Sequence, residues 1–365
     1  MTGIYIHIPF CKSKCPYCDF YSFKADEQTK DSYLTAVLSC LYKYRDKISD
    51  GIDTVYFGGG TPSYFGGERI KEVISCIKDN YSLSDSAEIT VECNPSSVDE
   101  TLVRHLHEAG VNRVSMGMQS AVDKERLSLG RASGREKISD CISLFRHYGI
   151  DNISLDLMLG IPYQTKESLK ESIDFIVGTN VNHVSAYMLK IEEDTVFHRL
   201  RDHLPLPDED EVCELYLYAS ELLRKEGFSH YEISNFAKEG FESRHNLRYW
   251  RCEEYLGIGP SAHSFIDGRR FFFERDFKGF IEGNPLVDDG IGGDEEEFIM
   301  LSLRLSEGLQ KEKYKKRFGK DIEEELIKKA LILEKEGLVT VKDDRIILTV
   351  KGFLVSNSVI SYLLN

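Results

Sequence analysis

Short apolar runs rich in β-branched residues alternate with amphipathic segments along the first half of the chain. This order is typical of parallel βα units, in which each helix crosses back over the sheet. We predict six strands, over residues 3–8, 53–59, 88–93, 113–119, 152–159 and 183–189. Because such crossovers are right-handed, the carboxyl ends of these strands share one rim. The pattern predicts an α/β fold, a partial (β/α)6 barrel, with functional residues on that rim.

The length of the chain indicates more than one folding unit, because 365 residues exceed what a single hydrophobic core usually holds. We predict a barrel domain over residues 1–235 and a smaller helical, winged-helix-like domain over 294–365. The segment between them, over 236–293, contains a linker. The linker is predicted from GNPLVDDGIGG, which is rich in glycine and aspartate. The last domain has 13 Lys and Arg against 14 Asp and Glu, which favours docking to a partner, or covering the open barrel edge, over binding DNA.

The composition restricts the setting of the protein. The formal net charge of −15 argues against a nucleic-acid backbone as the main partner. No apolar run is long enough to cross a bilayer, and no signal peptide is recognisable at the amino terminus. We therefore expect a cytoplasmic protein, in which thiols stay reduced and clustered cysteines bind metal instead of forming disulfides.

Three of the nine cysteines, Cys11, Cys15 and Cys18, lie within eight positions directly after the first predicted strand. Their Cys-x3-Cys-x2-Cys spacing differs from the paired Cys-x2-Cys knuckles of structural zinc sites. Three thiolates on one loop can each hold one iron of a [4Fe-4S] cluster and leave the fourth iron open for chemistry. The alternative is a zinc ion held by these cysteines and His7. The other six cysteines are scattered and are typical of small buried residues.

Small and polar residues follow other predicted strands on the same rim. The stretch GGGTP at 58–62 follows the second strand, Glu92 and Gln119 end the third and fourth, and Asp156 lies in the fifth. Taken alone, the glycines indicate no more than a tight turn, and the polar side chains no more than solvated strand ends. Their shared position favours one binding pocket.

The motif Cys-x3-Cys-x-aromatic-Cys resembles the signature of the radical S-adenosylmethionine (SAM) superfamily. In that superfamily the amine and carboxylate of SAM bind the open iron, and reductive cleavage gives a 5'-deoxyadenosyl radical. The resemblance implies that Tyr17 lies beside the adenine. It also implies that Gly59 and Gly60 let backbone groups approach the aminoacyl end of SAM.

Further segments resemble one branch of the superfamily, which contains the oxygen-independent coproporphyrinogen III dehydrogenases and the HemW-type heme chaperones. The resemblance spans about residues 3–265 and includes YIHIPFC, GGGTPS, ECNP, RVSMGMQS, LGR, LDLMLGIPYQT and YEISNFA. It implies contacts with one or two SAM molecules for Tyr5, Gly60, Thr61, Glu92, Gln119, Arg131 and Asp156, and for Lys190 after the sixth strand. Arg131 could instead be a surface charge at a helix start, although a guanidinium suits a carboxylate well.

Sequence details favour the chaperones within this branch. The dehydrogenases resemble Cys-x3-Cys-x2-Cys-x-Cys and carry an amino-terminal extension, whereas this chain has Phe20 at the last position and only ten residues before Cys11. Residues 244–265 contain a His-Asn-x-x-Tyr-Trp core that resembles the segment associated with heme handling in HemW-type proteins. One departure points the other way, because the family often has a histidine where Ser133 stands.

His245 and Trp250 of this core suggest a heme site on chemical grounds as well. Imidazole is a normal axial ligand of heme iron, and an indole ring can lie against the porphyrin plane. The alternative is that His245 caps a turn while Trp250 fills a core. No Cys-x-x-Cys-His signature for covalent heme attachment is present.

The sequence thus leads us to expect a heme chaperone that binds a [4Fe-4S] cluster, SAM and heme, and passes heme to recipient hemoproteins, including ones at the inner face of the membrane. Two alternatives stay open. One is the coproporphyrinogen III dehydrogenase itself, and the other is a radical SAM enzyme acting on another small substrate.

Overall fold

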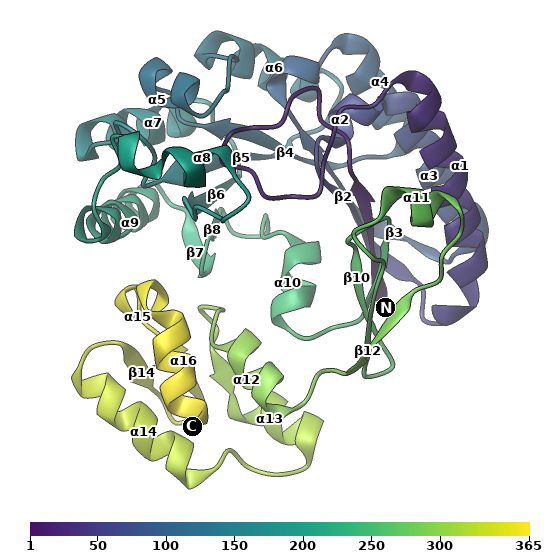
Figure 1. Cartoon of the computed structure of the whole chain (residues 1–365). Coiled ribbons are helices and arrows are strands. Elements are labelled where there is room, and N and C mark those ends of the chain that lie inside the picture. The colour runs from purple at the N-terminus through teal and green to yellow at the C-terminus, as the bar shows by residue number, and fades with distance from the viewer.

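The computed structural model describes all 365 residues. Six parallel strands form the centre of the main sheet and lie side by side in chain order (Figure 1). They are β1 Thr2–Ile8, β2 Ile52–Gly59, β3 Leu83–Cys93, β4 Arg113–Gln119, β5 Asn152–Leu159 and β6 His183–Met188. Each predicted strand coincides with one of these, and the predicted α/β fold is confirmed.

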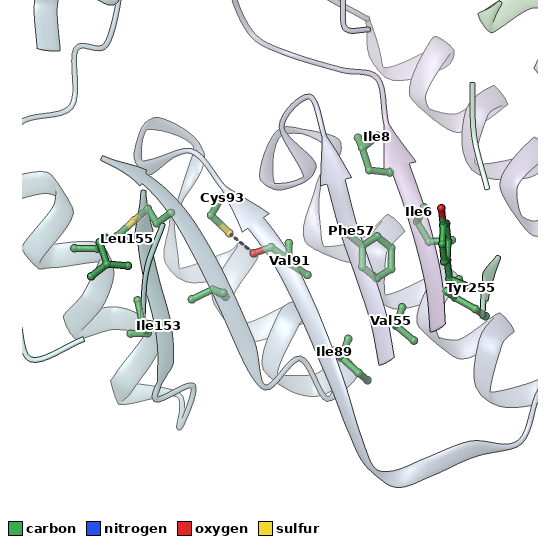
Figure 2. Packing of buried hydrophobic residues seen from close by; sticks show 14 of the residues in the cluster. Ile6, Ile8, Val55, Phe57, Ile89, Val91, Cys93, Ile153, Leu155 and Tyr255 are labelled. Atoms are coloured by element: carbon green, nitrogen blue, oxygen red, sulfur yellow. Dashed lines mark hydrogen bonds between the residues drawn. The ribbon is translucent and has the colours of Figure 1, made fainter. Parts of the chain in front are cut away.

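Helices cover the outer face of this curved sheet (Figure 1). The long ones are α1 Glu27–Tyr44, α3 Gly67–Asn80, α4 Glu100–Ala109, α6 Arg135–His147, α7 Lys166–Gly178 and α9 Glu209–Lys225; shorter ones are α2 Pro62–Phe65 and α5 Asp123–Ser128. Another short helix, α8 Val196–Leu200, lies instead beside the loop that follows β1. Alternate strand residues pack beneath these helices and form the core, among them Ile6, Val55 and Val91 (Figure 2).

The inner face of the sheet is polar, because successive strand residues point to opposite faces. Between the core residues of β1 to β3 stand Tyr5, Tyr56 and Glu92, and β5 alternates in the same way around Asp156. The interior of the half-barrel is therefore lined by hydrogen-bonding side chains. This leaves room for a polar ligand where many (β/α) barrels pack aliphatic residues.

Six further strands extend the sheet to twelve strands without closing it; β9 pairs parallel with β1, and the others pair antiparallel. β8 Asn235–Ala237 and β7 Ser229–Glu232 follow β6, while β9 Tyr255–Ile258, β10 His263–Ile266, β11 Arg269–Phe272 and β12 Val287–Ile291 continue beyond β1. The stretch predicted as a linker thus differs from the structure, since its Val287–Ile291 portion forms the edge strand β12. An ion pair between Arg269 of β11 and Asp288 of β12 joins the two strands. The composition of the glycine-rich stretch did not indicate this pairing.

Two helices complete this part of the chain, α10 Arg244–Trp250 and α11 Phe277–Ile281. α10 lies at the amino ends of β1 and β2, where Arg248 donates to the backbone carbonyl of Met1 at 2.9 Å and pairs with Asp53. No helix is long and apolar enough to span a membrane.

The smaller carboxyl-terminal domain has the winged-helix-like order that was predicted. Its helices are α12 Glu295–Ser302, α13 Lys311–Phe318, α14 Glu324–Lys335, α15 Val350–Leu354 and α16 Ser356–Leu364. β13 Leu309–Gln310, β14 Val339–Val341 and β15 Arg345–Leu348 form an antiparallel sheet in the order β13-β15-β14. In Figure 1 this domain lies beneath the barrel, on the side of α10 and away from the loop that follows β1.

Candidate functional site

A cavity of about 400 Å³ lies at the carboxyl ends of the parallel strands. It brings together eleven of the residues predicted from the sequence: Cys11, Cys15, Tyr17, Cys18, Gly59, Gly60, Thr61, Glu92, Gln119, Arg131 and Asp156. Tyr5 lines a second cavity of about 290 Å³, which shares Gly59 and Glu92 with the first. Residues from five strands and two loops therefore converge on one polar space.

The cysteine loop is anchored at both ends. The Cys11 N–H donates to the Phe23 carbonyl at 3.0 Å, and the Phe23 N–H donates to the Pro9 carbonyl at 2.9 Å. Phe10 is fully buried, and its ring packs edge-on against Phe23 and Tyr33 at centroid distances of 5.5 and 5.2 Å. The loop between these anchors is free to present its thiols to the cavity.

The donor set fits a four-iron cluster better than a single metal ion. All three thiols are free and partly exposed, yet no three His, Cys, Asp or Glu side chains are close enough to share one ion. A cluster binds each thiolate at a different iron, so its ligands need not converge on one point. Burial raises the pKa of the Cys18 thiol, a cost that a bound metal would offset.

His7 does not complete a zinc site. Its ring nitrogens already contact the Tyr5 hydroxyl and the Tyr21 carbonyl, each at 3.1 Å, and burial lowers its pKa to about 4. The ring lies at the second cavity and not among the three cysteines. The zinc alternative therefore has no fourth ligand in this arrangement.

The glycine stretch holds the cavity floor close to the cysteine loop. The Gly60 N–H donates to the Ile8 carbonyl and the Thr61 N–H to the Phe10 carbonyl, both at 2.8 Å. The Thr61 hydroxyl lies 3.3 Å from the Cys11 sulfur. A Cβ on Gly60 would lie 2.7 Å from the Ile8 carbonyl oxygen, so only glycine fits this close approach of two chains.

We expect Gly60→Ala to destabilise the protein by about 2 kcal/mol or more, because backbone atoms that cannot yield meet the added methyl. The variant should also bind less iron, since the two hydrogen bonds that position the loop would break. Urea unfolding and iron analysis measure both effects. Gly178→Ala is the matched control, because open space surrounds Gly178. Equal stability of the two variants would contradict the close approach.

Glu92 and Asp156 form a half-buried acidic pair on the inner face. Glu92 accepts hydrogen bonds from the Tyr56 hydroxyl at 2.8 Å and from the Gly59 N–H at 3.2 Å. Asp156 accepts one from the Ser115 hydroxyl at 3.0 Å. Burial is the largest cause of the rise in both pKa values, and it brings that of Glu92 to about 7. The pair is suited to a cationic ligand, which would draw both carboxyls into the ionised form.

Arg131 and Tyr17 face this acidic pair from the rim. The Arg131 guanidinium donates to the Tyr17 hydroxyl at 3.2 Å, while its Nε–H is buried without a partner. Gln119, which also lines the cavity, has a left-handed backbone with φ of 68°, a conformation that costs energy in a residue other than glycine. A guanidinium with a free donor inside a cavity is a site for a carboxylate.

Arg113 is a functional candidate that the sequence analysis missed. It is 1% exposed, forms no ion pair, and has no hydrogen-bond partner for its Nε and one of its terminal nitrogens. The strand neighbours Thr90 and Asn152 also have unpaired side-chain oxygens. The inward orientation of Arg113 could have been predicted, because Arg113 lies two residues before Ser115 on the same strand and alternate residues face the same side.

We expect Arg113→Met to weaken SAM binding at pH 7 by roughly 3- to 10-fold, because this cation lowers the pKa of both Glu92 and Asp156. The pH at which SAM affinity reaches half its maximum should rise. Equilibrium binding between pH 6 and pH 9 measures this shift. Arg113→Lys, which keeps the charge, should restore most of the profile; an unshifted profile in Arg113→Met would exclude this electrostatic role.

Lys190 lies outside the cavity, contrary to its predicted contact with SAM. Its side chain is 80% exposed and pairs with Glu192 at 2.5 Å. β6 ends at Met188, so Lys190 belongs to the loop beyond the rim. Lys190 is therefore on the surface near the mouth of the cavity and not inside it.

The structure places His245 and Trp250 in packing positions, away from the rim cavity. His245 is fully buried, and its ring nitrogens contact the Thr54 and Tyr249 hydroxyls, each at 2.8 Å. Burial lowers its pKa to about 3. Trp250 packs in a small cluster with Leu305 and others, and the Arg304 guanidinium lies 5.7 Å from its ring. The segment joins the amino ends of the strands to the smaller domain.

Comparisons with known proteins identify the family. A model described as the Radical SAM superfamily matches residues 5–176, and one described as the HemN C-terminal domain matches residues 295–355. The chain is 34% identical to the heme chaperone HemW of Bacillus subtilis strain 168, over 98% of each chain. The chain belongs to the HemW family. HemW of Escherichia coli K12 is 35% identical over 84% of this chain and 83% of its own.

Membership of the HemW family confirms the predicted superfamily and branch. As a radical SAM protein, the chain has a [4Fe-4S] cluster and SAM as its cofactors, as predicted. The solved structure of coproporphyrinogen III oxidase (HemN) from E. coli has a TM-score of 0.86 and 22% identity, and covers 99% of this chain and 89% of its own. That similarity confirms the radical SAM fold of this HemW family member.

Proposed function

We propose that the protein is a heme chaperone: it binds heme beside a SAM-loaded [4Fe-4S] cluster and delivers the heme to hemoproteins. The observation that carries this proposal is the match to proteins named heme chaperone HemW over nearly the whole length of the chain. Phe20 supports it, because an exposed phenylalanine stands where the dehydrogenases carry a fourth cysteine.

We assign the cavity residues as follows. Cys11, Cys15 and Cys18 hold three irons of the cluster, whose open iron supplies a binding position for the amine and carboxylate of SAM. Arg131 faces the carboxylate of a bound ligand, because its Nε–H has no partner within the protein.

The remaining cavity residues complete the SAM site. Glu92 and Asp156 balance the positive charges of SAM, while Gly59, Gly60 and Thr61 let the ligand approach the backbone. Tyr17 is the candidate for contact with adenine. Tyr5 and the second cavity would serve a second SAM molecule.

The structure bears on where heme binds in this proposal. His245 has no free ring nitrogen, so coordination of heme iron by this residue would require α10 to move away from β2. We propose that residues 236–293 act as part of the barrel domain, and that residues 294–365 form a docking domain for a partner. Recipient hemoproteins at the membrane surface would meet the protein through such a domain.

An anaerobic heme titration of the cluster-loaded protein, followed by absorbance, tests the carrier function. We expect saturable binding of about one heme per chain, because a carrier must hold its cargo at a defined site. His245→Ala should leave the affinity within about twofold, since the ring is packed and not accessible. Weak, unsaturable association of heme with the wild type would contradict the proposed function.

The second candidate function is oxidation of coproporphyrinogen III, which is favoured by the similarity of the fold to HemN. Incubation with coproporphyrinogen III, SAM and a reductant under anaerobic conditions distinguishes the two. The chaperone proposal predicts no protoporphyrinogen, whereas release of two carbon dioxides per substrate would establish the dehydrogenase.

A further inference from the structure

The loop that carries the cysteines forms no helix or strand between its anchors at Cys11 and Phe23. We call residues 18–22, which begin at the third cysteine, the second arm of the loop. Asp19 and Phe20 in this arm are exposed, Phe20 by 67%. Because an exposed arm of this kind has few contacts of its own, its position depends on the other segments that bind it.

Arg275, which lies in the loop after β11, binds the second arm at its exposed part. Its guanidinium donates to the Asp19 backbone carbonyl at 2.8 Å and lies 3.8 Å from the Asp19 carboxylate. The guanidinium carbon is also 5.6 Å from the centroid of the Tyr21 ring. The Arg275 side chain is 52% exposed, so these contacts bear on the loop more than on the stability of the core.

Tyr21 joins the second arm both to α11 and to β1. Its hydroxyl accepts from the Phe277 N–H at 3.0 Å, one of the N–H groups that the start of a helix leaves without a partner. Its carbonyl oxygen lies 3.1 Å from Nε2 of His7, which therefore donates, because a carbonyl only accepts. His7 Nδ1 in turn accepts from the Tyr5 hydroxyl at 3.1 Å. The arm is thus connected to a residue of the second cavity as well as to α11.

α11 is itself held firmly by aromatic packing. The Phe277 ring lies 4.9 Å from that of Phe23, edge to face, and 5.8 Å from that of the fully buried Tyr33. Phe280 is buried three positions later and packs against the rings of Tyr33 and Phe273 at 5.5 and 5.1 Å. Figure 1 shows α11 beside α1. This helix is therefore a fixed point to which the arm is bonded.

We propose that Arg275 and Phe277 are positioning residues for the cluster, and that together with Tyr21 they form a latch that keeps Cys18 in place. A cluster with three protein ligands is easily lost once one thiolate moves away, so fixing the third thiolate slows its release. This inference rests on the assignment of the three cysteines to the cluster, and not on heme binding.

The latch comes from outside the part of the chain that matches the Radical SAM superfamily, which ends at residue 176. Arg275 and Phe277 belong to the segment that joins the barrel to the smaller domain. Retention of the cluster therefore depends on this joining segment as well as on the barrel that supplies the cysteines.

The rate at which anaerobically reconstituted protein releases iron to a chelator tests the latch. We expect Arg275→Ala to release iron about 3- to 10-fold faster than the wild type, because a hydrogen bond from a charged donor is lost. Arg275→Lys keeps a cationic donor and should restore most of the wild-type rate. Asp19→Ala should stay within about twofold of the wild type, because it keeps the backbone carbonyl that accepts from Arg275.

Two further variants complete the experiment. Tyr21→Phe keeps the ring but removes the acceptor of the Phe277 N–H, and should release iron about twofold faster or more. Arg269→Ala is the matched control, because Arg269 is an ion-paired arginine of β11 that is 47% exposed and has no contact with the loop. Urea unfolding of the cluster-free proteins should give the same stability for Arg275→Ala and the wild type.

The outcomes separate the latch from the assignment on which it rests. If the wild type retains its cluster and Arg275→Ala releases iron no faster, or if Arg269→Ala releases it equally fast, the latch is wrong while the cluster ligands stand. Failure of Arg275→Lys to restore the rate, together with a lower stability of cluster-free Arg275→Ala, would show a general structural role instead. If the wild type itself does not hold about four irons, the cysteine assignment fails and the latch fails with it. The heme titration reports on the chaperone function separately.

Discussion

Cys15→Ala is expected to reduce iron and sulfide from about four each per chain to near zero after anaerobic reconstitution, because two thiolates cannot hold a four-iron cluster firmly. SAM binding should fall with it, since the open iron would be missing. Iron and sulfide analysis and the absorbance near 400 nm measure the loss. Cys213→Ala is the matched control, because Cys213 is a partly exposed thiol on α9, outside the cavity.

The stability of these two cysteine variants makes the test specific. Cys15 lies on a loop whose anchors are the flanking aromatic residues, so Cys15→Ala should leave the fold intact. A Cys15→Ala protein with the full iron and sulfide content of the wild type would contradict the assignment of the cluster ligands.

Glu92→Gln is expected to separate stability from ligand binding. Burial raises the pKa of the Glu92 carboxyl from 4.5 to about 7, so the folded protein binds more protons than the unfolded chain between these values. The free energy of unfolding therefore falls as pH rises from about 4.5 to 7, by at most about 3 kcal/mol, because the carboxyl lines an open cavity. Glutamine carries no charge and avoids this loss.

At pH 8, Glu92→Gln should therefore be at least as stable as the wild type, while its affinity for SAM falls by about tenfold or more. Urea unfolding at pH 5 and pH 8 and equilibrium SAM binding at pH 8 measure the two effects. In the wild type, SAM affinity should rise with pH through about 7, as the carboxyl ionises to meet a cationic ligand. A variant that binds SAM like the wild type would exclude Glu92 from the site.

The sequence predicted the site better at the carboxyl ends of the strands than elsewhere. Parallel strands bring residues far apart in sequence to one rim, so strand ends alone placed the cysteines beside Glu92 and Asp156. Arg113 was missed because it begins a strand. A charged residue at the start of a strand is expected to be exposed, whereas Arg113 is almost fully buried between β3 and β5.

The predictions that depended on later segments were less accurate. Lys190 follows β6, as predicted, but its side chain is exposed and pairs with Glu192 instead of lining the cavity. His245 and Trp250 have the chemistry of a heme site but lie at the opposite end of the strands, where α10 packs against β2. Residue type indicated what these side chains could bind, and only the packing showed that the His245 ring is fully buried with both nitrogens in contact with hydroxyl groups.

Transfer of heme is the measurement that tests the chaperone account most directly. Heme-loaded, cluster-containing protein is freed of unbound heme and mixed anaerobically with an apo b-type cytochrome, beside serum albumin carrying the same amount of heme. The account predicts that the cytochrome spectrum appears as the chaperone loses heme one for one, and faster than from albumin. Heme that stays on the protein, or leaves no faster than it leaves albumin, would contradict delivery as its function.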